Sequence, residues 1–218
     1  MKNFVETERL VLHRFIFEDG TLFQQMQKKH SHSSALALAA LIKKNQQIIS
    51  GIFGWWSDIS SPYSAGFHIK EDEKRWRHEQ QFQYYLYDKK SEKCIGIFCA
   101  LIENNQADVL VWLSDEGQRN GYAAEASKVF EKELFLTQGI DLIQYKCYQH
   151  NPNKQRVAAF LKVLNYAVPF EKGNAFVWQK SRQEFLLQNG FKETKIQVAN
   201  QKVMSFFKRM KIALGLIR

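Results

Sequence analysis

The sequence predicts one mixed α/β (α+β) domain, and three observations support this fold class. The chain has 218 residues, 45% of them hydrophobic, which allows a sizeable core and is too apolar for a disordered protein. Segments with strand periodicity alternate along the chain with segments of helical spacing. Because no repeat, low-complexity stretch or linker separates two domains, we expect a single domain over residues 1–190 and a tail over 191–218.

The N-terminal part predicts a strand and then helices. Residues 8–15 alternate loosely, which indicates a first strand. We expect three helices after it, over residues 18–29, 34–52 and 60–77. Glu18 and Asp19 place acids at the positive end of the first helix, Ser34 can cap the second, and Pro62 is typical of the first turn of the third.

The rest of the chain alternates between strands and helices. The expected strands are residues 82–87, 94–102, 108–113 and 142–148, the expected helices are 121–136 and 153–164, and 177–188 is a strand or a strand followed by a helix. The nearly continuous apolar run around Gly96 indicates a buried strand. Gly139 ends the helix that precedes the strand at 142.

The net charge of +9 comes mainly from the C-terminal tail. Residues 192–218 hold seven basic side chains and one acidic side chain, and the rest of the chain carries +3. The domain therefore has no basic excess of the kind that specific DNA binding requires. Residues 202–218 predict a basic amphipathic helix with three alternative roles: docking onto the domain or onto a second subunit of a homodimer, contact with a membrane surface, or attraction to RNA.

The cysteine and histidine patterns exclude several classes of site. The three cysteines form no CxxC pair and, being odd in number, cannot all pair in disulfides. This excludes a disulfide scaffold and a Cys-rich zinc site, and it favours a reducing cytoplasm. The six histidines have no metal-ligand spacing, so we expect no metal. The N-terminus lacks the apolar segment of a secretory signal, and no run of about 18 apolar residues predicts a membrane span.

The strongest candidate for chemistry is residues 107–126, which predict a buried strand, a short polar turn and a helix. Small residues at 121, 123 and 124 allow a ligand to approach the free backbone N–H groups at the helix start. Such a turn can bind a pyrophosphate. On spacing alone, an ordinary strand-to-helix turn is the slightly favoured explanation of the pattern.

The same stretch resembles the pyrophosphate-binding motif of the GNAT superfamily of acetyl-CoA-dependent N-acetyltransferases. The motif Gln/Arg-x-x-Gly-x-Gly/Ala reads Gln118-x-x-Gly121-x-Ala123 here. Residues 6–15 look like the N-terminal signature of the branch that acetylates the N-termini of ribosomal proteins, and residues 151–158 resemble that branch's Asn-x-x-Ser-x-x-Val segment. The resemblance implies the GNAT fold, a mixed, mostly antiparallel sheet of about six or seven strands, splayed between the fourth and fifth strands and flanked by helices.

The resemblance also implies where acetyl-CoA binds. Backbone amides at the helix start would hold the pyrophosphate, and the fourth strand would pair with the pantetheine arm and polarise the thioester carbonyl. The implied contacts are Val111, Trp112, Leu113, Gln118, Arg119, Asn120, Gly121, Tyr122, Ala123, Ala124, Asn151 and Lys154. Lys154 replaces the family's Ser, so it would bind a CoA phosphate in place of the hydroxyl contact.

In this family an amine attacks the thioester directly, so its protonation state determines how strong a base is needed. Deprotonation at pH 7 costs about 1.4 kcal/mol for an α-amine with a pKa near ~8, against about 4.6 kcal/mol for a Lys-like amine near ~10.4. We propose Asp108 as the base, through a water; the alternative is a strand-end carboxylate that binds solvent or substrate charge. Tyr148 and Tyr166 are the candidate general acids, and packing of each ring is the alternative.

The implied acceptor groove contains Trp55, Trp56 and Tyr63. Core or subunit packing is the alternative explanation for these rings. The hypothesis is an N-acetyltransferase acting on a protein N-terminus, for example that of a ribosomal protein. The alternatives are a small-molecule acceptor such as a polyamine or an aminoglycoside, and a non-catalytic GNAT. Lys154 and the Lys162-Val163 pair, which replaces the family's Gly-Phe, motivate the last alternative.

Overall fold

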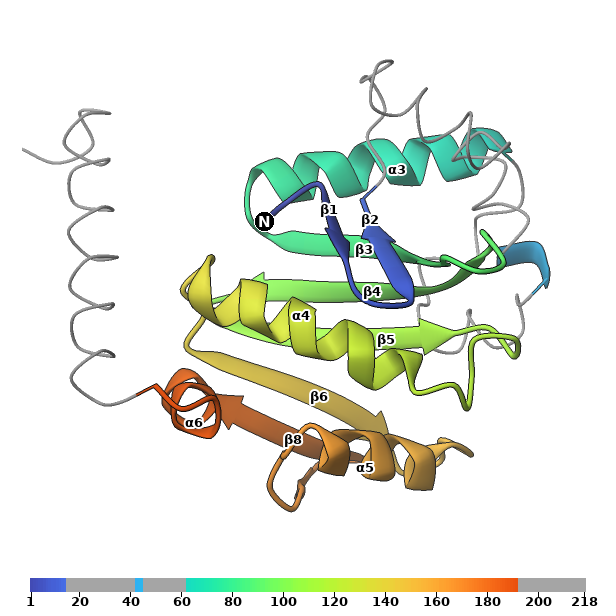
Figure 1. Ribbon diagram of the computed structural model, residues 1–218. Coiled ribbons are helices and arrows are strands. Elements are labelled where there is room, and N and C mark those ends of the chain that lie inside the picture. The colour runs from blue at the N-terminus through green and yellow to red at the C-terminus, as the bar shows by residue number, and fades with distance from the viewer. Residues whose placement is uncertain (15–41, 45–61, 192–218) are drawn as a thin grey trace, which may run out of the picture.

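Figure 1 shows the computed structural model, which describes residues 1–14, 42–44 and 62–191. A single eight-stranded sheet has the order β1-β2-β3-β4-β5-β6-β8-β7. The strands are β1 (Phe4–Glu6), β2 (Leu10–His13), β3 (Gln81–Asp88), β4 (Cys94–Glu103), β5 (Gln106–Leu113), β6 (Leu142–Tyr148), β7 (Phe170–Lys172) and β8 (Ala175–Ser181). The helices are α3 (Pro62–Arg77), α4 (Tyr122–Leu136), α5 (Lys154–Val163) and α6 (Arg182–Gln188). The mixed, mostly antiparallel sheet flanked by helices confirms the predicted fold class.

The predicted elements match the described part of the chain, with two additions at the sheet edges. Strands β1 and β7 have three residues each, too few to give a periodic pattern in the sequence. The segment predicted as strand or strand-helix is both: β8 ends at Ser181, which begins α6 with a capping box to Glu184. The helices expected over 18–29 and 34–52 lie outside the described residues except for the helical residues 42–44, and the tail lies outside them entirely.

Helices cover both faces of the sheet. On one face, Phe130 of α4 packs edge-on against Tyr84, with ring centroids 5.7 Å apart. On the other face, Asp72 of α3 accepts a hydrogen bond of 2.6 Å from Gln83. Because Gln83 and Tyr84 are neighbours on β3, their side chains point to opposite faces. Helix α5 contacts both α4 and β6. None of the helices described is long and apolar enough to cross a membrane.

The sheet opens between β5 and β6, the only parallel pair among the described strands (Figure 1). These strands pair over residues 106–109 and 142–145, and their pairing stops there. Strand β5 continues to pair with β4 as far as Leu113, while β6 continues to pair with β8 as far as Tyr148. The expected splay is therefore present. Since strand backbone groups alternate in direction, residues 110–113 turn some of their N–H and C=O groups toward the opening.

Candidate functional site

The loop after β5 is fixed to the neighbouring strand by backbone hydrogen bonds. The Ser114 N–H donates to the Ile95 carbonyl at 2.8 Å, and the Gly117 N–H donates to the Ser114 carbonyl at 2.9 Å. The Gln118 side-chain amide donates to the Leu113 carbonyl at 3.0 Å. A Cβ at Gly117 would lie 2.9 Å from the Ile95 carbonyl oxygen, so only glycine fits there without a shift. These contacts set where the chain enters α4.

The start of α4 presents a row of free backbone donors. Gly121 precedes the helix with φ 75° and no side-chain cap, and Arg119 also has positive φ, 64°. Within the described residues, the N–H groups of 119–124 donate no hydrogen bond, and the ladder begins with the Glu125 N–H to the Gly121 carbonyl. Free N–H groups and the helix dipole together favour an anion such as a phosphate.

The exposed edge of β5 leads from this loop into the opening of the sheet. Val111 and Leu113 are half-buried against the core, and Trp112 is only 4% exposed. The indole Nε1 of Trp112 is buried and has no hydrogen-bond partner in the described part of the chain. A buried donor without an acceptor is costly, so this N–H suits a ligand oxygen. The loop amides and the open backbone edge of β5 fit an extended ligand with an anionic end.

Asp108, the predicted base, lies at the end of the paired segment of β5, opposite Gln144. Its carboxylate accepts hydrogen bonds from the Gln144 amide and from the Lys146 ammonium on β6. The Gln144 carbonyl oxygen in turn accepts from Gln179 of β8 at 3.2 Å. The Asp108 and Lys146 side chains are 34% and 37% exposed, so this ion pair remains open to solvent and to a substrate.

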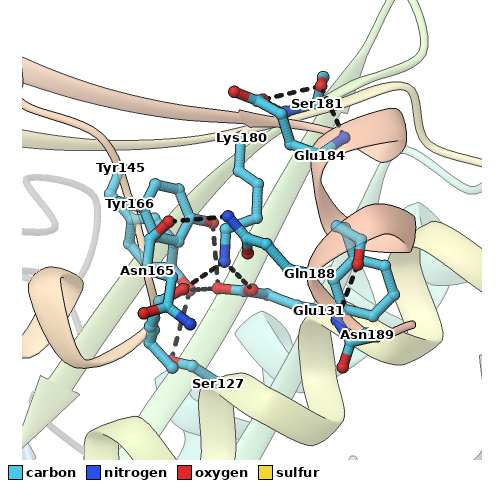
Figure 2. A network of polar contacts seen from close by, with 12 residues as sticks. Ser127, Glu131, Tyr145, Asn165, Tyr166, Lys180, Ser181, Glu184, Gln188 and Asn189 are labelled. Carbon is cyan, nitrogen blue, oxygen red and sulfur yellow. Dashed lines mark hydrogen bonds and ion pairs between the residues drawn. The ribbon is translucent and has the colours of Figure 1, made fainter. Parts of the chain in front are cut away.

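The two tyrosines predicted as general acids have different surroundings. Tyr148 ends β6, is 50% exposed and stacks on His150 with ring centroids 5.6 Å apart. Tyr166 is 8% exposed, and its hydroxyl donates to Glu131 at 3.0 Å (Figure 2). Burial, with the negative charge of Glu131, raises the pKa of Tyr166 far above its usual value. Tyr166 therefore lies in a buried hydrogen-bond network, which fits the packing alternative, and its role as a general acid stays a prediction.

The segment before α5 lies against the loop that precedes α4. The Asn151 side-chain oxygen accepts a hydrogen bond of 2.8 Å from the Asn153 N–H, which shapes the turn into α5. Arg156 donates to Gln118 at 3.3 Å and so links α5 to the loop. Lys154 begins α5 and is exposed. The structure thus brings Gln118, Asn151 and Lys154 to one region, and adds Arg156, whose only signal in the sequence is its place in the 151–158 segment.

The loop also receives Arg9, a residue that sequence reasoning placed in a family signature and not in the site. Its guanidinium donates to the Asn120 carbonyl at 2.9 Å and forms an ion pair of 2.6 Å with Glu125. Among the predicted acceptor residues, Tyr63 lies in the first turn of α3, and Trp55 and Trp56 lie outside the described residues. The described residues contain no group of His, Cys, Asp and Glu that could hold a metal ion.

Comparisons with known proteins agree with this fold. Residues 9–162 match the family model described as acetyltransferase (GNAT) domain. The fold resembles RimL, a ribosomal L7/L12 α-N-protein acetyltransferase solved with coenzyme A, at TM-score 0.64 and 15% identity, covering 82% of this chain and 97% of that one.

Two further solved structures have the same fold. The ribosomal-protein-S5-alanine acetyltransferase of Vibrio fischeri gives TM-score 0.62 at 16% identity, covering 83% of this chain and 97% of that one. The microcin C7 self-immunity acetyltransferase MccE, solved with acetyl-CoA and AMP, gives 0.61 at 14%, covering 80% and 93%. At these identities the likeness shows the fold alone. No curated protein sequence matches significantly.

Proposed function

The chain belongs to the acetyltransferase (GNAT) domain family and is an acyltransferase, and on this premise we propose that it acetylates the α-amine of a protein or peptide N-terminus. The donor is acetyl-CoA. One observation supports this assignment above the others: the unpaired amides of residues 119–124 lie at the end of β5, whose edge is open toward β6. Such an arrangement can bind a ligand with an anionic head, held by the amides, and an extended arm, held along the edge of β5.

The residues that would hold acetyl-CoA follow from this arrangement. The N–H groups from Arg119 to Ala124 would hold its diphosphate, Arg156 supplies positive charge beside Gln118, and the exposed Lys154 at the start of α5 would bind a further CoA phosphate. The backbone of residues 110–113 would bind the pantetheine amides. Acetyl-CoA supplies the activated acetyl thioester, and a β5 amide would stabilise charge that develops on its carbonyl oxygen.

Asp108 would act on the acceptor. Its carboxylate lies where the paired part of β5 ends, and it is partly open to solvent. An incoming ammonium group can replace Lys146 as the partner of this carboxylate, and the proton then leaves through a water to Asp108. An N-terminal α-amine fits such a modest base because its deprotonation at pH 7 costs only about 1.4 kcal/mol.

Tyr148 would return a proton to the departing thiolate. It lies two residues beyond Lys146 on β6, so the two side chains share one face of the sheet, and its ring is half exposed. Support for a protein N-terminus as acceptor comes from the names of two structural neighbours, RimL and the ribosomal-protein-S5-alanine acetyltransferase, which act on ribosomal proteins.

Calorimetry and an acceptor screen test the proposal. We expect the full chain to bind coenzyme A and Gly121→Glu to abolish this binding, because the new carboxylate would stand among the amides that hold the diphosphate. Peptides with a free Ser or Ala N-terminus should be acetylated, and the same peptides with a blocked N-terminus should not. If spermidine or kanamycin is acetylated and no peptide is, the acceptor is a small-molecule amine and not a protein N-terminus. If the full chain does not bind coenzyme A, the proposed function is rejected.

A further inference from the structure

Two segments that are far apart in the sequence meet at the start of α4. Arg9, immediately before β2, donates from Nε to a Glu125 carboxylate oxygen at 2.7 Å, and its guanidinium also pairs with that oxygen at 2.6 Å. The other Glu125 oxygen accepts the Arg9 backbone N–H at 2.9 Å and the Thr7 hydroxyl. The Glu125 side chain is 18% exposed, so its carboxylate is held on both oxygens in a largely buried position.

The same guanidinium reaches the loop itself. Arg9 Nη1 donates to the Asn120 carbonyl at 2.9 Å, and the guanidinium lies 4.7 Å from the centre of the Tyr122 ring. The Tyr122 hydroxyl donates to Asp88, at the end of β3, at 3.1 Å. The segment with the free amides is therefore itself fastened to the ends of two strands, β2 and β3.

The bond to Asn120 has a direct consequence for the next residue. In a planar trans peptide, the C=O of one residue and the N–H of the following residue point in opposite directions. Since Arg9 holds the Asn120 carbonyl, it also fixes the direction of the Gly121 N–H. Residues 119 and 121 both have positive φ, and glycine in particular samples many other conformations, so an unfastened loop would have to be ordered when the ligand binds.

The ion pair also has an electrostatic consequence. Glu125 lies in the first turn of α4, close to the amides that would hold a diphosphate. An unpaired carboxylate there would repel the ligand, and the Arg9 guanidinium neutralises it. The contact thus gives the loop both its shape and a favourable charge.

We propose that Arg9, held by Glu125, is a positioning residue that preorganises the amides of residues 119–124 for the diphosphate of acetyl-CoA. The proposal rests on the proposed function for its ligand. It assigns no contact between Arg9 and the reacting atoms. The role is therefore expected to affect binding of acetyl-CoA and not the chemical step.

The test compares Arg9→Met with a matched control on the same helix. Lys2 pairs with Glu133 at 3.1 Å and ties the N-terminal segment to the far end of α4, so Lys2→Met removes a tether without touching the loop. We expect Arg9→Met to weaken coenzyme A binding and to raise the KM for acetyl-CoA about tenfold, with kcat within about twofold of the wild type. Lys2→Met should leave both constants unchanged. Arg9→Lys, which keeps the charge but loses the planar fork, should lie between wild type and Arg9→Met.

Hydrogen exchange of the ligand-free protein separates this proposal from the proposed function. Arg9→Met should speed exchange of the hydrogen-bonded amides that frame the loop, those of Gly117, Gln118 and Glu125, and leave β4 and β5 protected. Unchanged loop exchange, or equal losses of coenzyme A affinity in Arg9→Met and Lys2→Met, would overturn the positioning role. If exchange in the loop is faster in Arg9→Met but the wild type binds no coenzyme A, Arg9 still orders the loop. The proposed function is then overturned, and with it the ligand assigned to the loop.

Discussion

Glu131 of α4 and Lys180 of β8 form an ion pair of 3.2 Å, with their side chains 3% and 4% exposed (Figure 2). Tyr145 and Tyr166 donate to the same Glu131 oxygen at 3.2 and 3.0 Å. The Lys180 ammonium also lies 4.1 Å from the centre of the Tyr166 ring. Burial raises the pKa of Glu131 despite the opposing effect of Lys180. This network joins α4 to the strands on the far side of the sheet opening.

Removal of one partner of this pair should destabilise the fold strongly. Lys180→Met leaves the Glu131 carboxylate buried without its counter-ion, which we expect to lower the free energy of unfolding by about 3–5 kcal/mol. Urea denaturation followed by circular dichroism measures the change. The exposed pair of Lys44 and Glu116, 2.9 Å apart, is the control, and Lys44→Met should cost less than about 1 kcal/mol. An equal decrease in the free energy of unfolding in the two variants would contradict the prediction that the buried network stabilises the fold more than an exposed pair does.

Asp72 predicts a pH dependence of stability. Asp72 lies on α3, and its carboxylate accepts hydrogen bonds from the side-chain amides of Gln81 and Gln83. Burial raises its pKa to about 7. Because the pKa is higher in the folded state than in the unfolded state, the stability from this group is full below about pH 4 and is lost as the pH rises through 7.

The variant Asp72→Asn tests this dependence, since it cannot ionise. Its free energy of unfolding relative to that of the wild type should rise from pH 5 to pH 8, with a slope of up to about 1.4 kcal/mol per pH unit between the two pKa values. Glu103→Gln, at an exposed end of β4, serves as the control and should follow the wild type at every pH. A constant difference between Asp72→Asn and wild type across this range would refute the assignment.

Gly117 predicts a steric effect at the loop. A Cβ there would lie 2.9 Å from the Ile95 carbonyl oxygen and 3.2 Å from the Ile95 Cβ. We expect Gly117→Ala to move the loop away from β4, lower stability by about 1–3 kcal/mol and weaken coenzyme A binding. Gly190→Ala, at positive φ with open space around it, should lower stability without changing affinity. If Gly117→Ala binds coenzyme A with unchanged affinity, the position of the loop does not determine ligand binding, and the prediction is wrong.

The sequence predicts the central strands and the loop, but not the contacts that fix the loop. Strands β3 to β6 are long enough to show their periodicity, and the small residues before α4 indicate the free amides. Arg9 and Glu125 are 116 residues apart, and each looks like a separate motif until the sheet brings β2 beside α4. The pairing of Asp108 with Lys146 depends on the register between β5 and β6, which no local pattern contains.

This register leads to a prediction about the acceptor. Asp108→Asn should lower kcat/KM for the acceptor peptide about 10²-fold, because the carboxylate that attracts the ammonium and takes its proton is lost. The KM for acetyl-CoA should stay within about twofold, since Asp108 lies on the paired part of β5 and not in the loop. Steady-state kinetics with each substrate varied in turn measures both constants.

Lys146→Met tests the same carboxylate from the opposite side. Under the proposed function, Lys146 competes with the acceptor's ammonium for Asp108. The Lys146 and Asp108 side chains are both about one-third exposed, so removing the lysine leaves no deeply buried charge. We expect the KM for the acceptor peptide to fall by up to about fivefold, the equivalent of an exposed ion pair. A rise in this KM would show that Lys146 itself binds the acceptor, and that Asp108 serves to hold the lysine in place.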